Sequence, residues 1–386
     1  MTGSPGVLLI TPRGPHERGG LAQAALRVAT QAVARGERVH MLYPSTEPAP
    51  GVRGLQVRAG LCLHPVGLPR DDEARWRVWT DQAVDLVHRC ELDLVHGFYA
   101  SDAGYVATLA AAMTGMRSVV SIRGNDLDRG LYRQGELPFL SHALTRATCV
   151  TAVSRAGAAA AAGIFGRAVE HVTNSVDTQR YRPQEADNTR RAVLGDGPVL
   201  GFVGELRQKK GLGFLLPALH ALLARGPHSL LLIGGVRADA QAAYGAFCER
   251  SPEAASRIHV LDYDSSPERL CRTLALCDLL VFPSLQEGTP NAVLQAMAAA
   301  RPVLATAVGG HLELIQSGRT GALLAPSELD RLPEAIAELL ALPTPVRRAM
   351  GEAARAFVAT AHSPEAESAA YGRVYRAARA RSSRTP

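Results

Sequence analysis

Short apolar runs, separated by turn residues and by longer amphipathic stretches, recur along the whole chain. In the first half they lie at residues 7–10, 39–43, 92–96, 118–122, 149–153 and 169–173. In the second half they lie at residues 199–203, 230–233, 258–261, 278–282, 303–305 and 322–324. Such runs, alternating with helical stretches, are typical of buried parallel strands joined by helices. The pattern predicts two doubly wound α/β domains in tandem, each built on a parallel sheet.

The domain boundaries follow from length and local composition. A chain of 386 residues is too long for one typical core, and two domains are expected. Residues 184–198 are mostly polar and end in Gly-Asp-Gly-Pro, so we place the linker there. The prediction is a first domain over residues 1–183, a second over 199–363, and a C-terminal helix within 364–386.

Composition narrows the class of protein. Hydrophobic residues make up 47% and charged residues 20%, as in an ordinary globular enzyme. No apolar run approaches the 18 residues of a membrane span, and the first run, residues 7–10, is typical of a strand and not of a signal peptide. Six cysteines without C-x-x-C spacing favour buried thiols in a reducing compartment over a zinc site. We therefore expect a soluble, cytoplasmic protein.

The net charge of +6 does not indicate a nucleic-acid partner, because the arginines are scattered and no aromatic-rich basic stripe accompanies them. An amphipathic stretch over residues 75–89 carries Trp76 and Trp79. Packing on the sheet is its favoured role, which leaves at most a peripheral membrane contact. Of the 42 basic residues only two are lysines, Lys209 and Lys210, and both lie in the loop after the run at 199–203.

The stretch over residues 281–310, VFPSLQEGTPNAVLQAMAAARPVLATAVGG, carries the strongest chemical signal. An apolar strand leads into a loop with Glu287, then Thr289 suits an N-cap and Pro290 suits the first position of a helix over 291–300. A helix N-terminus presents unpaired N–H groups to an anion such as phosphate. The carboxylate of Glu287, which lies beside this helix start in the sequence, is expected to face a neutral polyol and not the phosphate. The alternative is an ordinary βαβ crossover with an incidental loop carboxylate.

These residues resemble the retaining glycosyltransferases of family four, which have the GT-B fold of two Rossmann-like domains with an interdomain cleft. The family signature is Glu-x7-Glu in the setting P-S-x-x-E-G-x-P-x-x-x-x-E-A-M-A. The matching residues here are Pro283, Ser284, Glu287, Gly288, Pro290, Ala296 and Met297, whereas Gln295 replaces the second Glu. The resemblance covers nearly the whole chain and implies that the last helix crosses back to the N-terminal domain.

The resemblance also implies a donor site. Residues 203–211 are similar to the family segment V-G-R-L-x-x-x-K-G, whose Arg and Lys hold the pyrophosphate. Lys210 matches the Lys, but Glu205 stands at the Arg position, and Arg207 could point the same way in an extended segment. A solvated surface pair is the alternative for the two lysines. The implied donor-binding residues are Gly19, Gly20, Gly204, Arg207, Lys210, Glu287, Gly288, Thr289, Pro290, Asn291 and Gln295, with Gln295 on the ribose.

In the first domain the family has H-G-x-D where this chain has Arg123-Gly124-Asn125-Asp126. Asp126 matches, whereas Arg123 replaces the His that contacts the donor sugar, so that contact is altered. His96 at a strand end is either a cleft residue or a structural hydrogen-bonding residue. The expected acceptor-side residues are therefore His96, Arg123, Asn125 and Asp126, and the expected catalytic residues are Glu287, Lys210, Arg207 and Asp126.

The function that the resemblance implies is transfer of a sugar from a nucleotide diphosphate sugar to an acceptor hydroxyl, with retention of configuration. We expect no cofactor and no metal, because cationic side chains and a helix terminus face the leaving group; Asp262-Tyr263-Asp264 suits a strand-end turn better than a metal site. The acceptor is a small molecule, a glycan or a lipid-linked sugar. Alternatives are a GT-B sugar-nucleotide epimerase and a catalytically degenerate nucleotide-sugar-binding protein, the latter motivated by Glu205, Arg123 and Gln295.

Overall fold

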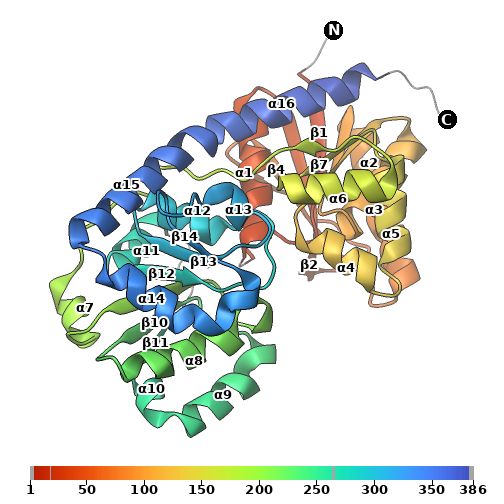
Figure 1. The fold of residues 1–386 in the computed structure, drawn as a ribbon. Coiled ribbons are helices and arrows are strands. Elements are labelled where there is room, and N and C mark those ends of the chain that lie inside the picture. The colour runs from red at the N-terminus through yellow and green to blue at the C-terminus, as the bar shows by residue number, and fades with distance from the viewer. Residues whose placement is uncertain (1–3, 18, 263–265, 382–386) are drawn as a thin grey trace. The chain divides into compact units, whose positions relative to one another are not determined.

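The computed structural model describes residues 4–17, 19–262 and 266–381 (Figure 1). The chain forms two compact units, Met1–Asn174 with Pro364–Pro386, and Ser175–Ser363. The second unit therefore starts before residue 183, where the sequence places the end of the first domain. It also includes the expected linker, in which α7 (Asn188–Val193) forms. The last helix, α16 (Pro364–Ala380), belongs to the first unit.

An eight-stranded sheet forms the centre of the first unit, in the order β3-β4-β2-β1-β5-β6-β7-β8. Every neighbouring pair is parallel except β3 with β4. The central strands are buried on both faces, which explains their continuous apolar runs. The strands are β1 (Gly6–Ile10), β2 (Arg38–Pro50), β3 (Gln56–Arg58), β4 (Leu61–Gly67), β5 (Leu94–Phe98), β6 (Arg117–Ile122), β7 (Cys149–Ala152) and β8 (Glu170–His171).

Helices cover both faces of this sheet. On one face α1 (Gly20–Ala34) lies beside α16, and Val28 and Tyr371 share a core cluster with strand residues (Figure 1). On the other face Trp79 of α2 (Asp72–Arg89) is fully buried, so α2 packs on the sheet as the favoured alternative predicts. The remaining helices are α3 (Asp102–Thr114), α4 (Asn125–Tyr132), α5 (Leu137–Arg146) and α6 (Arg155–Phe165).

The second unit has a six-stranded parallel sheet in the order β11-β10-β9-β12-β13-β14. Its strands are β9 (Val199–Val203), β10 (Ser229–Ile233), β11 (Ile258–Leu261), β12 (Leu279–Phe282), β13 (Val303–Thr306) and β14 (Ala322–Leu324). They coincide closely with the six apolar runs of the second half of the sequence. The chain proceeds from β9 to β10 on one side and later returns to β12 on the other side of β9. The strand order therefore reverses between β9 and β12.

Two separate cores lie against the faces of the second sheet. Helices α11 (Pro267–Leu274), α12 (Asn291–Ala298) and α15 (Thr344–Ala361) pack on one face. Helices α8 (Leu212–Leu223), α9 (Gln241–Arg250), α10 (Pro252–Ser256) and α14 (Leu332–Ala341) pack on the other. Short elements complete the unit: α13 (His311–Leu314) and the 3-10 turns η1 (Gln208–Lys210), η2 (Ala238–Ala240) and η3 (Pro326–Arg331).

Candidate functional site

The loops that follow β9 and β12 lie at the carboxyl edge of the second sheet. These two strands are neighbours at the point where the strand order reverses. In open parallel sheets, ligands bind outside the carboxyl ends of the strands at such a point. The loop between β9 and α8 carries Arg207 and Lys210, and the loop between β12 and α12 carries Glu287. The topology thus brings together three of the four residues predicted to be catalytic.

Glu287 is held by two donors that share one of its oxygens. Oε1 accepts a hydrogen bond from the Ser284 hydroxyl at 2.8 Å and another from the Lys210 ammonium. The carboxylate side chain is only 11% exposed. Burial alone would raise the pKa of Glu287, but the charges of Lys210 and His311 and the two hydrogen bonds lower it below its ordinary value. Glu287 is therefore an anchored, ionised carboxylate whose Oε2 makes no hydrogen bond to the described residues.

Close backbone packing fixes the distance between the two loops. Gly211 has φ of 84°, and a Cβ at this position would clash with the carbonyl oxygen of Pro283. The backbone N–H of Leu285 donates to the carbonyl oxygen of Lys209 at 2.9 Å. Because glycine alone tolerates both the positive φ and the close approach, Gly211 allows the Lys210 loop to lie against the Glu287 loop.

A third loop, between β13 and α13, supports Glu287 from the other side. The N–H of Gly310 donates to the carbonyl oxygen of Gly288 at 2.9 Å, and a Cβ on Gly309 would clash with the carbonyl oxygen of Glu287. The next residue, His311, is fully buried, and its Nδ1 lies 2.8 Å from the Thr306 carbonyl oxygen. The motif recognised in the sequence ends at Gly310, so His311 was not predicted, although its position directly after two glycines of a site loop is a possible signal.

Arg207 is a half-buried cation in an extended segment, with φ of −160°. Its guanidinium forms no hydrogen bond or ion pair with the part of the chain that the structure describes, and its Nε is buried. Burial lowers the pKa of Arg207, with a further decrease from Arg237, while Glu287 and Glu205 oppose the shift. A buried cation without an ion-pair partner is suited to binding an anion.

The beginning of α12 differs from the expectation. The helix starts at Asn291, and its N-cap is Pro290. The prediction of Thr289 as N-cap and Pro290 as first helical residue was wrong by one position. Thr289 and Pro290 are buried, and Gly288 contacts Gly310 through its carbonyl oxygen. In the neighbouring β9–α8 loop, Gly204 donates its N–H to the carbonyl oxygen of Ile233 at 2.8 Å.

Gln295 lies on α12, and its partner comes from a distant part of the chain. Its side-chain NH₂ donates to the hydroxyl of Tyr181 at 3.0 Å. The bond uses one of the two amide hydrogens and leaves the amide oxygen available as an acceptor. Gln295 therefore retains the acceptor capacity that a ribose contact needs.

In the first unit, Asp126 joins two loops and is fully buried. Its carboxylate accepts hydrogen bonds from the backbone N–H of Ala100 at 2.7 Å and of Arg123 at 2.9 Å. Burial raises the pKa of Asp126, and the hydrogen bonds oppose that shift. A carboxylate enclosed by backbone donors is suited to positioning the loop of Arg123, and the catalytic and acceptor-side roles of Asp126 stay predictions.

Arg123 belongs to a polar network that includes the C-terminal helix. Its guanidinium donates to the Tyr371 hydroxyl at 3.2 Å and to Oδ1 of Asn174, and it lies 4.2 Å from the centre of the Phe98 ring. Burial lowers the pKa of Arg123, and Tyr371 and Glu367 oppose the shift. The arginine that replaces the family histidine is thus held by residues of α16.

His96 is fully buried with both ring nitrogens occupied. Nδ1 lies 2.8 Å from the Tyr375 hydroxyl, and Nε2 lies 2.8 Å from the Ser121 hydroxyl. Burial lowers the pKa of His96 to about 3, so the ring is neutral at pH 7. Of the two alternatives, these contacts favour the structural hydrogen-bonding residue, and the acceptor-side role of His96 stays a prediction.

The other predicted residues of the first unit are less constrained. Gly19 precedes α1 as its N-cap, Gly20 is the first residue of that helix, and both are exposed. Asn125 begins α4, but its side chain lies outside the described part of the structure. Donor contacts of Gly19 and Gly20 and an acceptor contact of Asn125 stay predictions.

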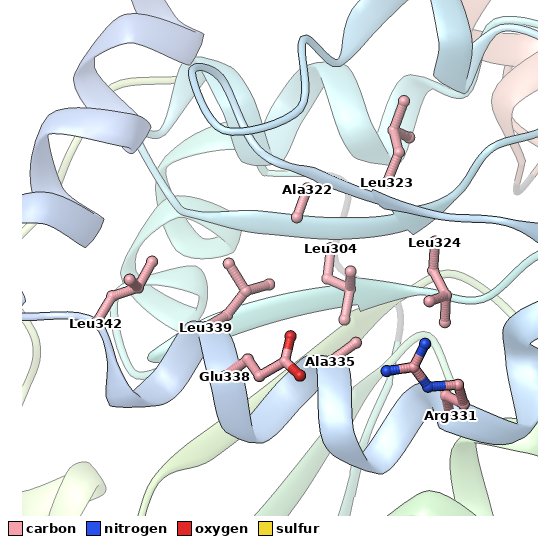
Figure 2. A pocket seen from close by; sticks show the side chains of 9 residues that line it. All are labelled: Leu304, Ala322, Leu323, Leu324, Arg331, Ala335, Glu338, Leu339 and Leu342. Atoms are coloured by element: carbon pink, nitrogen blue, oxygen red, sulfur yellow. The ribbon is translucent and has the colours of Figure 1, made fainter.

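A cavity of about 340 Å³ lies elsewhere in the second unit (Figure 2). Leucine and alanine side chains of β13, β14 and α14 line it, together with Arg331 and Glu338. It contains none of the predicted donor-site residues. The donor site is therefore defined by its residues at the carboxyl edge, not by this apolar cavity.

The described residues show neither a cluster of metal ligands nor a helix that could span a membrane. No group of three or more His, Cys, Asp or Glu side chains within residues 4–17, 19–262 and 266–381 is arranged to hold a metal ion. Asp262 is described, whereas the rest of the Asp262-Tyr263-Asp264 triplet lies outside the described residues. Over the same part of the chain, no helix has the length and apolar character needed to cross a membrane.

Comparisons with protein families give matches over both units. The model of glycosyl transferases group 1 matches residues 197–342, and the model of Glycosyltransferase Family 4 matches residues 18–180. Over 375 residues the chain is 28% identical to the GDP-mannose-dependent alpha-(1-6)-phosphatidylinositol monomannoside mannosyltransferase of Mycolicibacterium smegmatis, covering 90% of this chain and 92% of that relative. Over 195 residues it is 31% identical to the D-inositol 3-phosphate glycosyltransferase of Rhodococcus opacus, covering 48% of this chain and 43% of that relative.

Solved structures show the same fold. The sucrose-phosphate synthase of Thermosynechococcus elongatus superposes with a TM-score of 0.82 at 19% identity, over 96% of this chain and 98% of that chain. The Anabaena protein HepE, solved in complex with UDP and glucose, has a TM-score of 0.79 at 19% identity, over 96% of this chain and 99% of that chain. At this identity the likeness concerns the fold alone.

Proposed function

Because the chain belongs to the group 1 glycosyltransferases of family four, with the GT-B fold and a nucleotide-sugar donor, we propose that it transfers a hexose with retention of configuration and without a metal ion. The observation that carries this proposal is the Lys210–Glu287 pair at the carboxyl ends of β9 and β12. This pair supports the proposal because a cation suited to a leaving phosphate and a carboxylate suited to sugar hydroxyls lie where parallel sheets bind ligands.

The diphosphate of the donor binds Lys210 and Arg207. Arg207 supports this assignment because its half-buried guanidinium has no ion-pair partner among the described residues. The N–H groups at the start of α12 add positive potential next to Glu287. As the bond between sugar and phosphate breaks, negative charge develops on the leaving phosphate. Preorganised donors aimed at that charge contribute about 3–4 kcal/mol each to transition-state stabilisation.

Retention follows from attack on the same face that the diphosphate leaves. The acceptor hydroxyl forms the new bond to the anomeric carbon, and the leaving phosphate takes the acceptor's proton. On this route Glu287 binds the sugar: Lys210 and Ser284 bind its Oε1, and Oε2 can accept hydrogen bonds from sugar hydroxyls. No covalent enzyme intermediate forms on this route.

The positive charge that a divalent metal supplies in other transferases is provided here by Lys210, Arg207 and the N-terminus of α12. Among donors, GDP-mannose and UDP-sugars are the first to test, because one similar relative is GDP-mannose-dependent and HepE was solved with UDP. The names of the two relatives point to an acceptor with an inositol ring or a sugar attached to one. The cytoplasmic location stays a prediction.

The epimerase and the degenerate binding protein are the alternatives to be tested. Purified protein is incubated with each nucleotide sugar, with and without inositol-containing acceptors, and the products are followed by NMR. The proposal expects a glycoside with the anomeric configuration of the donor, formed equally with and without EDTA. An epimerised nucleotide sugar, an inverted product, or full loss of turnover in EDTA that manganese restores would each contradict it.

A further inference from the structure

One ring nitrogen of His311 has a defined hydrogen-bond partner, and the other has none among the described residues. Nδ1 lies 2.8 Å from the carbonyl oxygen of Thr306, and because a carbonyl oxygen only accepts, Nδ1 carries the proton. Nε2 of the neutral ring is then a lone-pair acceptor. It is buried, and none of the described groups donates a hydrogen bond to it. A buried polar atom without a hydrogen-bond partner is unfavourable, so its presence beside the donor site calls for an explanation.

His311 lies on a loop bound to the Glu287 loop, and the side-chain charges that act on it belong to the donor site. Its loop is bound to the Glu287 loop through the hydrogen bond from Gly310 to Gly288. Among the described residues, the side-chain charges acting on His311 are those of Glu287 and Lys210. Burial lowers the pKa of His311, Lys210 lowers it further, and Glu287 raises it, with a net decrease. His311 is therefore neutral as long as Lys210 is paired with Glu287.

We propose that His311 takes up a proton at Nε2 when the diphosphate of the donor binds, and thereby holds Glu287 ionised and in place for the sugar. This rests on the proposed function, in which Lys210 binds the diphosphate. The phosphate oxygens compete with Glu287 for the Lys210 ammonium and add negative charge beside His311. The proton comes from solvent and forms an N–H bond at Nε2, while the bond from Nδ1 to Thr306 is kept. His311 is thus a positioning residue for Glu287.

The test is calorimetric titration of UDP, GDP and ADP into the full-length protein at pH 7, in buffers with different enthalpies of ionisation. The dependence of the observed heat on the buffer gives the number of protons taken up. The matched variant is His311→Asn, whose amide NH₂ can still donate to the Thr306 carbonyl but which lacks Nε2. Any proton exchange by the nucleotide itself occurs with both proteins, so the difference between them isolates His311.

We expect wild type to take up a substantial fraction of one proton more than His311→Asn, and the variant to keep nucleotide binding with a lower rate of transfer. Equal proton uptake by the two proteins would overturn the inference while leaving the proposed function intact. Failure of wild type to bind any of the three nucleotides would overturn both. If His311→Asn does not fold, ¹⁵N-histidine NMR of wild type decides: the Nε2 resonance must change to that of a protonated nitrogen on addition of nucleotide, and an unchanged resonance contradicts the inference.

Discussion

The ammonium group of Lys210 donates a hydrogen bond to Oε1 of Glu287, which lies 77 positions further along the chain. The two residues meet because β9 and β12 are neighbours in the sheet. The cation expected to bind the leaving phosphate is therefore paired with the carboxylate expected to bind the sugar. When the donor binds, its phosphate oxygens compete with Glu287 for the Lys210 ammonium. Substitutions at the two residues are therefore expected to change the affinity for free nucleotide in opposite directions.

Lys210→Ala is expected to weaken binding of the preferred nucleoside diphosphate at least tenfold and to lower turnover about 100-fold or more, because one preorganised donor to the leaving phosphate is lost. Lys209→Ala is the matched control. The contact of Lys209 with Leu285 uses its backbone carbonyl, so it survives the change. We expect its effects to stay within about twofold, a change below 0.5 kcal/mol. Equal effects of the two substitutions, measured by calorimetry and initial rates, would identify the loop as a basic surface only.

Glu287→Gln should abolish most transfer but leave binding of the free nucleoside diphosphate intact or tighter. The sugar loses a charged acceptor, whereas the free nucleotide has no sugar to contact. The substitution also removes the competitor for the Lys210 ammonium, since a neutral amide attracts it less. Rates and calorimetric affinities are compared with those of wild type. A collapse of nucleotide binding in this variant would show that Glu287 does not face the sugar.

Stability should fall as the pH is lowered from about 7 to 5.5. The pKa of His96 is lowered by burial to about 3, against 6.5 for an unperturbed histidine. Between these values the unfolded chain binds a proton that the folded chain does not, so the free energy of unfolding decreases as the pH falls. One such histidine accounts for about 1 kcal/mol over this range. Burial lowers the pKa of His64 to about 4, which adds a second contribution.

The measurement is the urea midpoint of the unfolding transition of the first unit at several pH values. The variant His96→Asn is expected to be less stable than wild type at every pH, because the hydrogen bonds of residue 96 to Tyr375 and Ser121 are altered. Its free energy of unfolding should nevertheless depend less on pH than that of wild type. An unchanged slope would mean that His96 is protonated in the folded protein.

Much of the fold followed from the sequence because buried parallel strands have continuous apolar runs. All six strands of the second sheet were predicted within a few residues. β4 was missed, since His64 and Pro65 interrupt its apolar character and its burial depends on neighbours that the sequence does not reveal. The antiparallel β3 was missed too: Val57 is 69% exposed, so its strand has no core to mark it.

Site residues could be predicted where they belong to a short sequence motif. They were harder to predict where contacts with residues distant in the sequence determine what a side chain does. Lys210 and Glu287 stand in recognisable loops. The sequence could not show that Asp126 is enclosed by backbone donors from two loops, or that Tyr375 of the last helix occupies a nitrogen of His96. His311 was missed for the same reason, because a lone histidine has a meaning only once Thr306 and Glu287 are placed beside it.

Gln295 provides the last prediction, since it replaces the Glu of the family motif. Its NH₂ is bound to Tyr181 at 3.0 Å, and its oxygen can accept a hydrogen bond from a ribose hydroxyl. Hydrogen bonds to a charged acceptor contribute about 1.5–3 kcal/mol, against about 0.5–1.5 kcal/mol for neutral ones. The difference is on the order of 1 kcal/mol, or several-fold in affinity, which is too small to end catalysis. We therefore expect wild type to be an active enzyme with somewhat weak nucleotide binding.

Gln295→Glu should keep activity and tighten binding of the nucleoside diphosphate several-fold, and Gln295→Ala should weaken it by a similar factor. Tyr181→Phe is the control for orientation: it removes the bond that holds the amide but keeps Gln295, so its effect on affinity should be smaller than that of Gln295→Ala. Calorimetric titration of all four proteins measures these affinities. If no change at position 295 alters affinity, Gln295 does not contact the ribose. If Gln295→Glu binds nucleotide while wild type binds none, the chain is a degenerate member of its family, and the carboxylate lost at this position is the reason.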